Sequence, residues 1–189
     1  IEFAIPGISV TIPPVVFCLL SIVLIWVSIN VTNCSDGVDG LSATLTIITL
    51  ITLYIVKGMK GTTDNFSYLI LLFVICLLGY LWYNAAPSHL MMGDAGSRAM
   101  GIFIAIAALK TESPFLYIFA AFVLIADGGI GIVKVALLRF LKIKILTNVR
   151  TPLHDHVRKV WDWSNTQTVF RFGIIQIVIS VATIYMLML

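Results

Sequence analysis

Long apolar runs alternate with short polar segments along this chain of 189 residues. We interpret six of these runs as membrane-spanning helices, because such a helix needs about 20 mostly apolar residues. The runs lack the regular alternation of apolar and polar residues that is typical of strands in a membrane barrel. The predicted helices cover residues 12–31, 41–57, 67–84, 96–110, 114–138 and 168–189.

This pattern predicts an all-α fold, a polytopic membrane helix bundle of about six spans that forms a single integral membrane domain over residues 1–189. The composition agrees, since 60% of the residues are hydrophobic and 11% are charged, against about 25% charged residues in soluble domains. Three glycines weaken the fifth helix and predict a bend near Gly128–Gly131. The net charge of only +3 argues against a nucleic-acid partner.

The distribution of basic residues predicts the orientation in the membrane. Six alternating spans bring the segments 32–40, 85–95 and 139–167 to one face. That face has eight lysines and arginines against three on the other, and such an excess marks the cytoplasmic side. The eight are Arg98, Arg139, Lys142, Lys144, Arg150, Arg158, Lys159 and Arg171, and the three are Lys57, Lys60 and Lys110.

The first polar cluster on this face is "NVTNCSDGVDGL" at residues 30–41, with Asp36 and Asp39 three residues apart. If the second helix begins near Asp36, this spacing puts both carboxylates on one helical face. Two such groups can hold Mg²⁺ or bind a sugar or a base. Helix capping is the alternative, because Asp is a good N-cap residue. We favour a functional role, since two carboxylates follow Asn33 closely.

The second cluster, from Gly93 to Ser97, opens the fourth predicted helix. A helix N-terminus with small residues is suited to phosphate. Asp94 would repel a bare phosphate, but it would not repel one that is carried by Mg²⁺. The alternative is again a capping role, for Asp94 or for Ser97.

The third cluster is His154-Asp155-His156, which follows Pro152. On an extended backbone the two histidines would point the same way, and they could bind a metal or donate hydrogen bonds to phosphates. A surface pair without a role is an equally open interpretation.

Asp127 lies in the middle of the fifth predicted helix, where an acid is costly and usually functional. Lys134 follows two turns later on the same helical face. A structural polar contact inside the bundle is the alternative interpretation, and the sequence does not decide between the two.

Taken in order, these motifs resemble those of the polyprenyl-phosphate N-acetylhexosamine-1-phosphate transferases. The resemblance comprises residues 30–41, "NAAPSHLMMGDAGS" at 84–97, "PLHDH" at 152–156 and Arg171-Phe172. It extends over essentially the whole chain, and its ordered set of motifs is far more specific than any one of them.

The resemblance implies an Mg²⁺-dependent transfer of a phospho-sugar from a UDP-sugar to undecaprenyl phosphate, with release of UMP. The form of "PLHDH" favours the branch that uses UDP-MurNAc-pentapeptide and makes lipid I for peptidoglycan, with the UDP-GlcNAc branch as the alternative. Such enzymes are multi-pass proteins of the bacterial inner membrane with a cytoplasmic active site, and a homodimer is compatible with this reading. They have about ten spans, so we expect this chain, which lacks an initiator Met, to be the C-terminal part.

Site residues follow from the same resemblance. It implies catalytic roles for Asp36, Asp94, His154 and His156, with Asp94 and Asp36 at the metal. It implies substrate-binding roles for Asn33, Gly37, Val38, Asp39, Asn84, Met91 and Asp155. The sequence departs from the family at Asp155 (usually His), Met91 (usually Phe), Asp127 (usually Glu) and Lys134 (usually Gln). The family's paired aspartates of an earlier loop are absent.

Two other functions fit less well. A CDP-alcohol phosphotransferase would need D-G-x-x-A-R and further spaced aspartates, and residues 36–41 do not continue in that way. An ion-coupled transporter that uses Asp127 and Lys134 would place its polar groups in the middle of the membrane, whereas most acids here lie at the predicted cytoplasmic edge.

Overall fold

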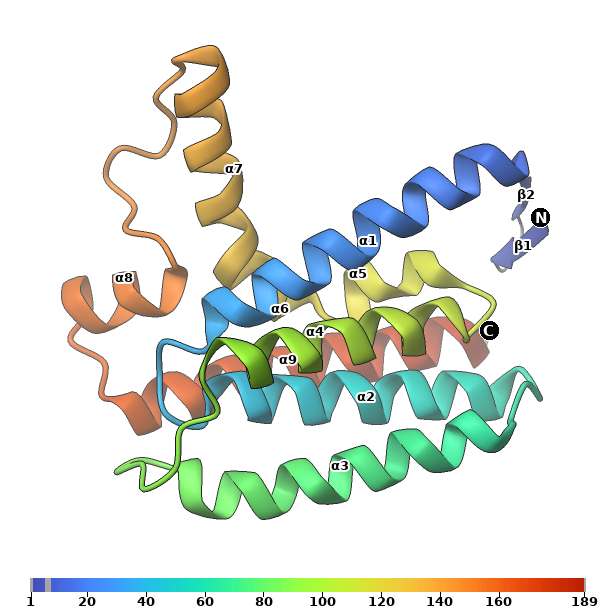
Figure 1. The fold of residues 1–189 in the computed structure, drawn as a ribbon, viewed down its shortest axis with the longest axis horizontal. Coiled ribbons are helices and arrows are strands. Elements are labelled where there is room, and N and C mark those ends of the chain that lie inside the picture. Colours follow the sequence, from blue (N-terminus) through green and yellow to red (C-terminus); the bar gives the residue numbers. More distant parts are fainter. Residues whose placement is uncertain (1, 6–7, 189) are drawn as a thin grey trace.

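The computed structural model describes residues 2–5 and 8–188, which form a helix bundle preceded by a short hairpin (Figure 1). The hairpin pairs β1 (Glu2–Ile5) with β2 (Ile8–Thr11) in antiparallel register. Four long helices follow: α1 (Pro14–Ser35), α2 (Leu41–Met59), α3 (Asn65–Asn84) and α4 (Gly93–Leu109).

The second half of the chain is more irregular. A 3₁₀ turn (Pro114–Leu116) leads into α5 (Tyr117–Ala120) and α6 (Phe122–Leu124), and a π-helical turn (Ile125–Gly129) leads into α7 (Ile130–Ala136). A second π-helical turn (Leu137–Leu141) ends this segment. The last helices are α8 (Leu153–Val160) and α9 (Asn165–Met188).

Helices occupy all six predicted positions, and the all-α membrane fold is confirmed. Among the described residues, four helices are long and apolar enough to cross a membrane: α1, α2, α3 and α9. The bent pair Pro114–Ala120 and Phe122–Leu141 makes a fifth if it counts as one span. With 17 residues, α4 is shorter than these. Length and composition therefore support four to five spans of a multi-pass membrane protein, fewer than the six predicted.

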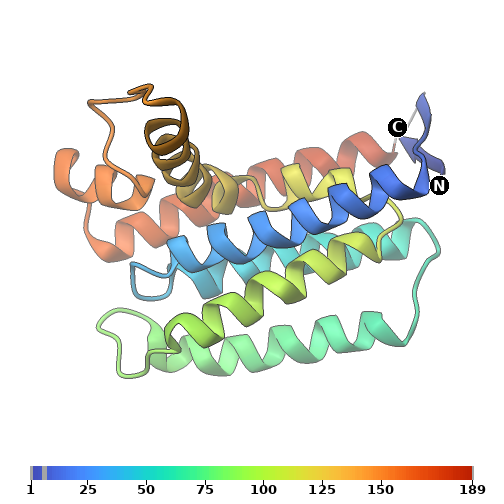
Figure 2. The ribbon, with the colours of Figure 1, turned by 45° about the horizontal axis from the view of Figure 1, so that its top comes forward.

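The long helices run side by side, and the polar segments gather at one end (Figures 1 and 2). The α1–α2 and α3–α4 connections and α8 lie at this end, as the alternation of spans predicts. The α2–α3 connection and both chain ends lie at the other. Of the four long apolar helices, α2 is the most enclosed. In its most apolar stretch 67% of the residues are buried, against 17% in α1. Distant polar segments therefore meet because the helices around α2 are antiparallel neighbours.

Two glycines let other helices touch the backbone of α1. A Cβ added to Gly101 of α4 would lie 2.6 Å from the Cα of Ile29, and one added to Gly128 would lie 2.8 Å from the Cα of Val31. The Ser28 hydroxyl donates a hydrogen bond of 2.7 Å to the carbonyl oxygen of Gly101. Only glycine permits so close an approach. The end of α1 is thus held between α4 and the π-helical turn.

The predicted bend near Gly128–Gly131 is wrong in its position. The chain bends by 73° between Ala120 and Phe122, whereas Gly128 serves close packing against α1. At this bend the buried Gln176 side chain of α9 forms hydrogen bonds with main-chain groups. Its Oε1 accepts from Val123 N–H at 2.8 Å, and its Nε2 donates to the carbonyl oxygens of Phe119 (3.1 Å) and Ala120 (3.0 Å).

We expect Gln176→Leu to lower the melting temperature of the full-length protein. Leucine keeps the volume but leaves buried main-chain groups at the bend unpaired, and each such group costs about 1–3 kcal/mol. Thermal unfolding in detergent measures the effect, with Ile175→Leu on the exposed face of α9 as the control. Equal melting temperatures for the two variants would show that the bend does not depend on Gln176.

Candidate functional site

Residues 36–40, which we call the acidic loop, connect α1 to α2. Asp36 directly follows α1 and Leu41 begins α2, so Asp36 and Asp39 lie in a turn and not on one helical face. The expectation of a shared face is therefore wrong. Val38 is only 4% exposed and belongs to the hydrophobic core. Its side chain anchors the loop, while both carboxylates remain partly accessible.

Asp36 lies in an environment that disfavours its charge. Burial raises the pKa of Asp36, and the negative charges of Asp94 and Asp39 raise it further, while a hydrogen bond from the Ser42 hydroxyl opposes the shift. Within the described part of the chain, Asp36 forms no ion pair with a lysine or arginine. A cation bound beside it would relieve the repulsion among the three carboxylates.

Asn84, at the end of α3, joins the acidic loop to the segment 85–92. Its side-chain oxygen accepts from the N–H of Gly40 at 2.9 Å. Its amide nitrogen donates to the carbonyl oxygen of Leu90 at 2.8 Å and to the Ser88 hydroxyl at 3.2 Å. In this conformation both polar atoms of the Asn84 side chain form hydrogen bonds with other groups of the protein. Its role in substrate binding stays a prediction.

Asp94 and Met91 lie on the exposed rim of the site. Asp94 is in the first turn of α4, as predicted. Its side chain is 79% exposed and lies 3.3 Å from Arg98. Met91, just before α4, is 80% exposed. Below this rim the Asn33 side chain donates to the Ser97 hydroxyl at 2.9 Å, which ties the end of α1 to the start of α4.

The two histidines do not point the same way, because residues 153–160 are helical and not extended. Side chains at positions i and i+2 of a helix point in directions about 200° apart around its axis. His154 is 3% exposed, and its N–H and Nδ1 both lie within hydrogen-bond distance of the Asp127 carboxylate. Its Nε2 faces the acidic loop, where a Cβ added to Gly37 would lie 2.5 Å away.

His156 lies on another side of α8. Its Nδ1 accepts from the N–H of Arg150 at 3.3 Å, and its ring packs edge-on against Trp161 with centroids 5.8 Å apart. The structure therefore brings His154, and not His156, to the acidic loop.

Two further predictions concern charged neighbours of these histidines. Partial burial acts to raise the pKa of Asp155, but Lys159 at 3.0 Å and the neighbouring positive charges hold it below its ordinary value.

Asp127 pairs with His154 and not with Lys134. Lys134 donates instead to the carbonyl oxygens of Leu146 and Val149 at 3.1 and 2.7 Å. Asp127 lies in the π-helical turn that ends at Gly129, and Lys134 lies in α7.

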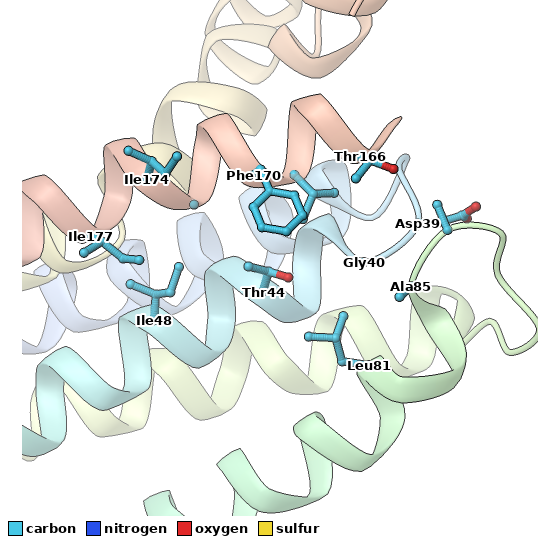
Figure 3. Close-up of a pocket in the computed structure, with 13 residues that line it drawn as sticks. Asp39, Gly40, Thr44, Ile48, Leu81, Ala85, Thr166, Phe170, Ile174 and Ile177 are labelled. Atoms are coloured by element: carbon cyan, nitrogen blue, oxygen red, sulfur yellow. The ribbon is translucent and has the colours of Figure 1, made fainter. Parts of the chain in front are cut away.

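An apolar cavity of about 370 Å³ adjoins the acidic loop (Figure 3). Asp39 and Gly40 lie at one end, and Ile48 and Ile177 lie farther along it. Its other walls are Thr44, Leu81, Ala85, Ala86, Thr166, Val169, Phe170, Gly173 and Ile174. A cavity that is apolar along its length and acidic at one end is suited to a molecule with an apolar chain and a polar head.

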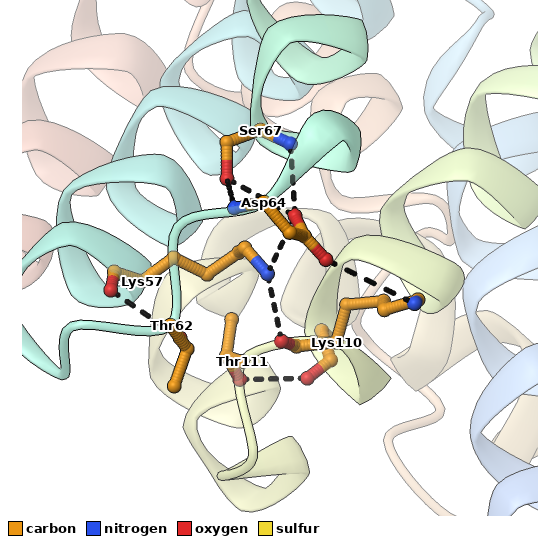
Figure 4. A network of polar contacts seen from close by, with 7 residues as sticks. Lys57, Thr62, Asp64, Ser67, Lys110 and Thr111 are labelled. Atoms are coloured by element: carbon orange, nitrogen blue, oxygen red, sulfur yellow. Dashed lines mark hydrogen bonds and ion pairs between the residues drawn. The ribbon is translucent and has the colours of Figure 1, made fainter.

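The opposite end of the bundle pairs its charges internally (Figure 4). Lys57 is 1% exposed, and its Nζ lies 3.2 Å from an Asp64 oxygen and 3.1 Å from the carbonyl oxygen of Lys110. The Lys110 ammonium lies 3.9 Å from the other Asp64 oxygen. Asp64 also forms a capping box with Ser67 at the start of α3. This cluster stabilises the junction of α2, α3 and α4.

The donor set fits an Mg²⁺ ion only in part. Among the residues that the structure describes, no group of three or more His, Cys, Asp or Glu side chains could hold a metal ion. Mg²⁺ usually takes one or two carboxylates, with water and substrate phosphates as its other ligands. Asp36 and Asp94, which are near enough to influence each other electrostatically, fit that limited requirement.

The fold and the site together define a multi-pass membrane protein with an acidic, cation-suited site at one end of its bundle. The chain belongs to glycosyl transferase family 4, whose family model matches residues 1–112.

Curated relatives have a more specific name. The chain is 41% identical over 182 residues to a phospho-N-acetylmuramoyl-pentapeptide-transferase of Treponema pallidum (strain Nichols), covering 88% of this chain and 50% of the relative. Proteins of the same name from Brachyspira hyodysenteriae (33% over 172 residues; 82% and 44% covered) and Borreliella burgdorferi strain B31 (32% over 166 residues; 80% and 46%) are also similar. The chain spans about half the length of these relatives.

Sequence reasoning missed three contributors to the site's geometry: Ser42, Gly101 and the contact between Asp127 and His154. Ser42 and Gly101 are common helix residues with no distinguishing pattern around them. Asp127 was marked as an unusual intramembrane acid, but its partner lies 27 residues later. Only the packing of α8 against the π-helical turn reveals the pair.

We expect Asp36→Asn to raise the melting temperature at neutral pH in metal-free buffer. An acid whose pKa is raised by folding holds its proton more tightly in the folded state. Its contribution to stability therefore falls as pH rises from the ordinary value of 3.8 through the raised one, and stays lower above it. Asparagine cannot ionise, so the variant does not lose this stability as the pH rises. Melting curves across that range should converge with wild type at low pH, and a variant less stable than wild type at neutral pH would contradict the prediction.

Proposed function

We propose that the protein containing this chain transfers phospho-MurNAc-pentapeptide from UDP-MurNAc-pentapeptide to undecaprenyl phosphate, forming lipid I and UMP. The observation that carries the proposal is the gathering of Asp36, Asp39, Asp94 and His154 around one loop at the end of a membrane bundle. A soluble nucleotide sugar and a lipid phosphate can meet at such a place. The name of the similar proteins supports this choice of donor over UDP-GlcNAc.

In this proposal Asp36 and Asp94 would hold Mg²⁺, which, when bound, offsets negative charge on the diphosphate and favours departure of UMP. Asp94 is exposed enough to reach a ligand from solvent, whereas Asp36 is partly buried and fixed by Ser42. The burial of Asp36 keeps one carboxylate in a set position, while the exposed one can adjust.

The acceptor is a lipid, so its phosphate must approach from the bilayer. The apolar cavity beside Asp39 supports this part of the proposal, because it could hold a stretch of polyprenyl chain with the head group near the acidic loop. The eight-to-three excess of basic residues supports a cytoplasmic position of this end in the bacterial inner membrane.

The transporter alternative loses its main support. It requires Asp127 and Lys134 to act together in the middle of the membrane, and the two side chains have separate partners.

We expect Asp94→Asn in the full-length protein to abolish Mg²⁺-dependent turnover while the protein stays folded, because the exposed carboxylate contributes little packing. Formation of lipid-linked product from UDP-MurNAc-pentapeptide and undecaprenyl phosphate is the measurement. Glu112→Gln, an exposed acid at the opposite end of the bundle, is the matched control. Near-normal turnover in Asp94→Asn would remove Asp94 from the metal site.

We expect Met91→Phe to tighten the binding of a uridine nucleotide. Base–aromatic stacking is worth about 1–3 kcal/mol. Methionine already supplies part of this contact, so the net gain should be roughly 0.5–1 kcal/mol, or about a two- to fivefold lower Kd. The side chain is 80% exposed, so phenylalanine should not overpack the site.

Calorimetric titration with a uridine inhibitor measures this change. Leu90→Phe, which alters the exposed neighbour, controls for a general gain in apolar surface. An unchanged affinity in Met91→Phe would show that Met91 does not face the base.

A further inference from the structure

Asp127 is a completely buried acid to which the proposed reaction assigns no role. It lies in the π-helical turn Ile125–Gly129, and His154 in the first turn of α8 is its partner. One carboxylate oxygen accepts from the His154 main-chain N–H at 2.7 Å, and the other lies 2.9 Å from the ring Nδ1. The acid therefore fixes both the start of α8 and the plane of the imidazole ring.

The ring is confined from the opposite side as well. A Cβ added to Gly37 would lie 2.5 Å from Nε2 and 3.0 Å from Cε1 of His154. An ionised carboxylate can only accept, so a neutral His154 ring beside it carries its hydrogen on Nδ1, and Nε2 is the nitrogen that faces the acidic loop. His156 does not share this arrangement, since it has Arg150 N–H and Trp161 as its neighbours.

We propose that Asp127 is a positioning residue that holds His154 with Nε2 directed at the diphosphate of the nucleotide sugar, and that Gly37 supplies the space for this ring. The inference rests on the proposed transferase function. A buried carboxylate that orients a histidine through Nδ1 sets which nitrogen is available for substrate.

The asparagine variant of Asp127 makes a specific test possible. The main-chain N–H of His154 can only donate, so it selects the side-chain oxygen of the new asparagine. The amide nitrogen is then left facing Nδ1, where it can only donate. The oxygen that accepts from the main chain also lies 3.1 Å from Nδ1, but the amide nitrogen takes the nearer position at 2.9 Å. We therefore expect the ring to accept at Nδ1 and to carry its hydrogen on Nε2, which inverts the tautomer at nearly constant volume. A purely structural role for Asp127 predicts no effect of this inversion on turnover.

The experiment uses the full-length protein with ¹⁵N-labelled histidine. We expect ¹⁵N NMR to show the His154 hydrogen on Nδ1 in wild type and on Nε2 in Asp127→Asn. We expect kcat to fall at least about tenfold, the lower end for loss of a group that orients a functional histidine, with a smaller change in KM for the UDP-sugar. Asp127→Glu, which keeps the carboxylate, should restore the wild-type tautomer and part of kcat.

Gly37→Ala disturbs the same ring from its other side and should also lower kcat, whereas Gly58→Ala, where nothing lies within 4 Å of the added Cβ, should not. In the Asp127→Asn background the ring is less firmly held, so Gly37→Ala should cause a smaller loss than in wild type.

Three results would overturn the inference: a wild-type His154 with its hydrogen on Nε2, an inverted tautomer with normal kcat, or fully additive losses in the double variant. A wild-type protein without turnover would instead refute the proposed function, and the nitrogen spectra would still decide how the ring is held.

Discussion

The close contact of α1 with its two neighbours is the constraint on which the site depends. Gly101 and Gly128 bring α4 and the π-helical turn against the backbone of α1, with no side chain between them. The acidic loop begins at the residue after α1, so its position is set by this contact. The same contact holds α4, which has Asp94 in its first turn, and the π-helical turn, which has Asp127, against α1.

The two ends of the bundle use aspartate in opposite ways. Asp64 lies among lysines and closes a helix cap, so it contributes to the fold without any ligand. Asp36 is partly buried near two other carboxylates, and this arrangement opposes folding at neutral pH. Natural proteins tolerate such local losses where a function needs the group. The contrast supports the proposed cation site at one end of the bundle and an ordinary structural cluster at the other.

The periodicity of the sequence was sufficient for the helices and for the meeting of three polar segments at one end, because both follow from local pattern and chain alternation. The same reasoning placed Asp94 in the first turn of α4. It failed where a long-range partner decides the geometry. The bend lies where Gln176 bonds to main-chain groups and not at the glycines nearby, and His154 is held by Asp127. A pattern along the chain contains no information about which distant side chain completes a hydrogen bond.

The role of Gln176 has a consequence for the order of events during biosynthesis. Val123 precedes its hydrogen-bond partner Gln176 by 53 residues, so the main-chain groups at the bend have no partner on α9 until that helix is made. Unpaired main-chain groups are very unfavourable within a bilayer. The segment from α5 to α7 therefore reaches its final shape only after α9 has entered the membrane.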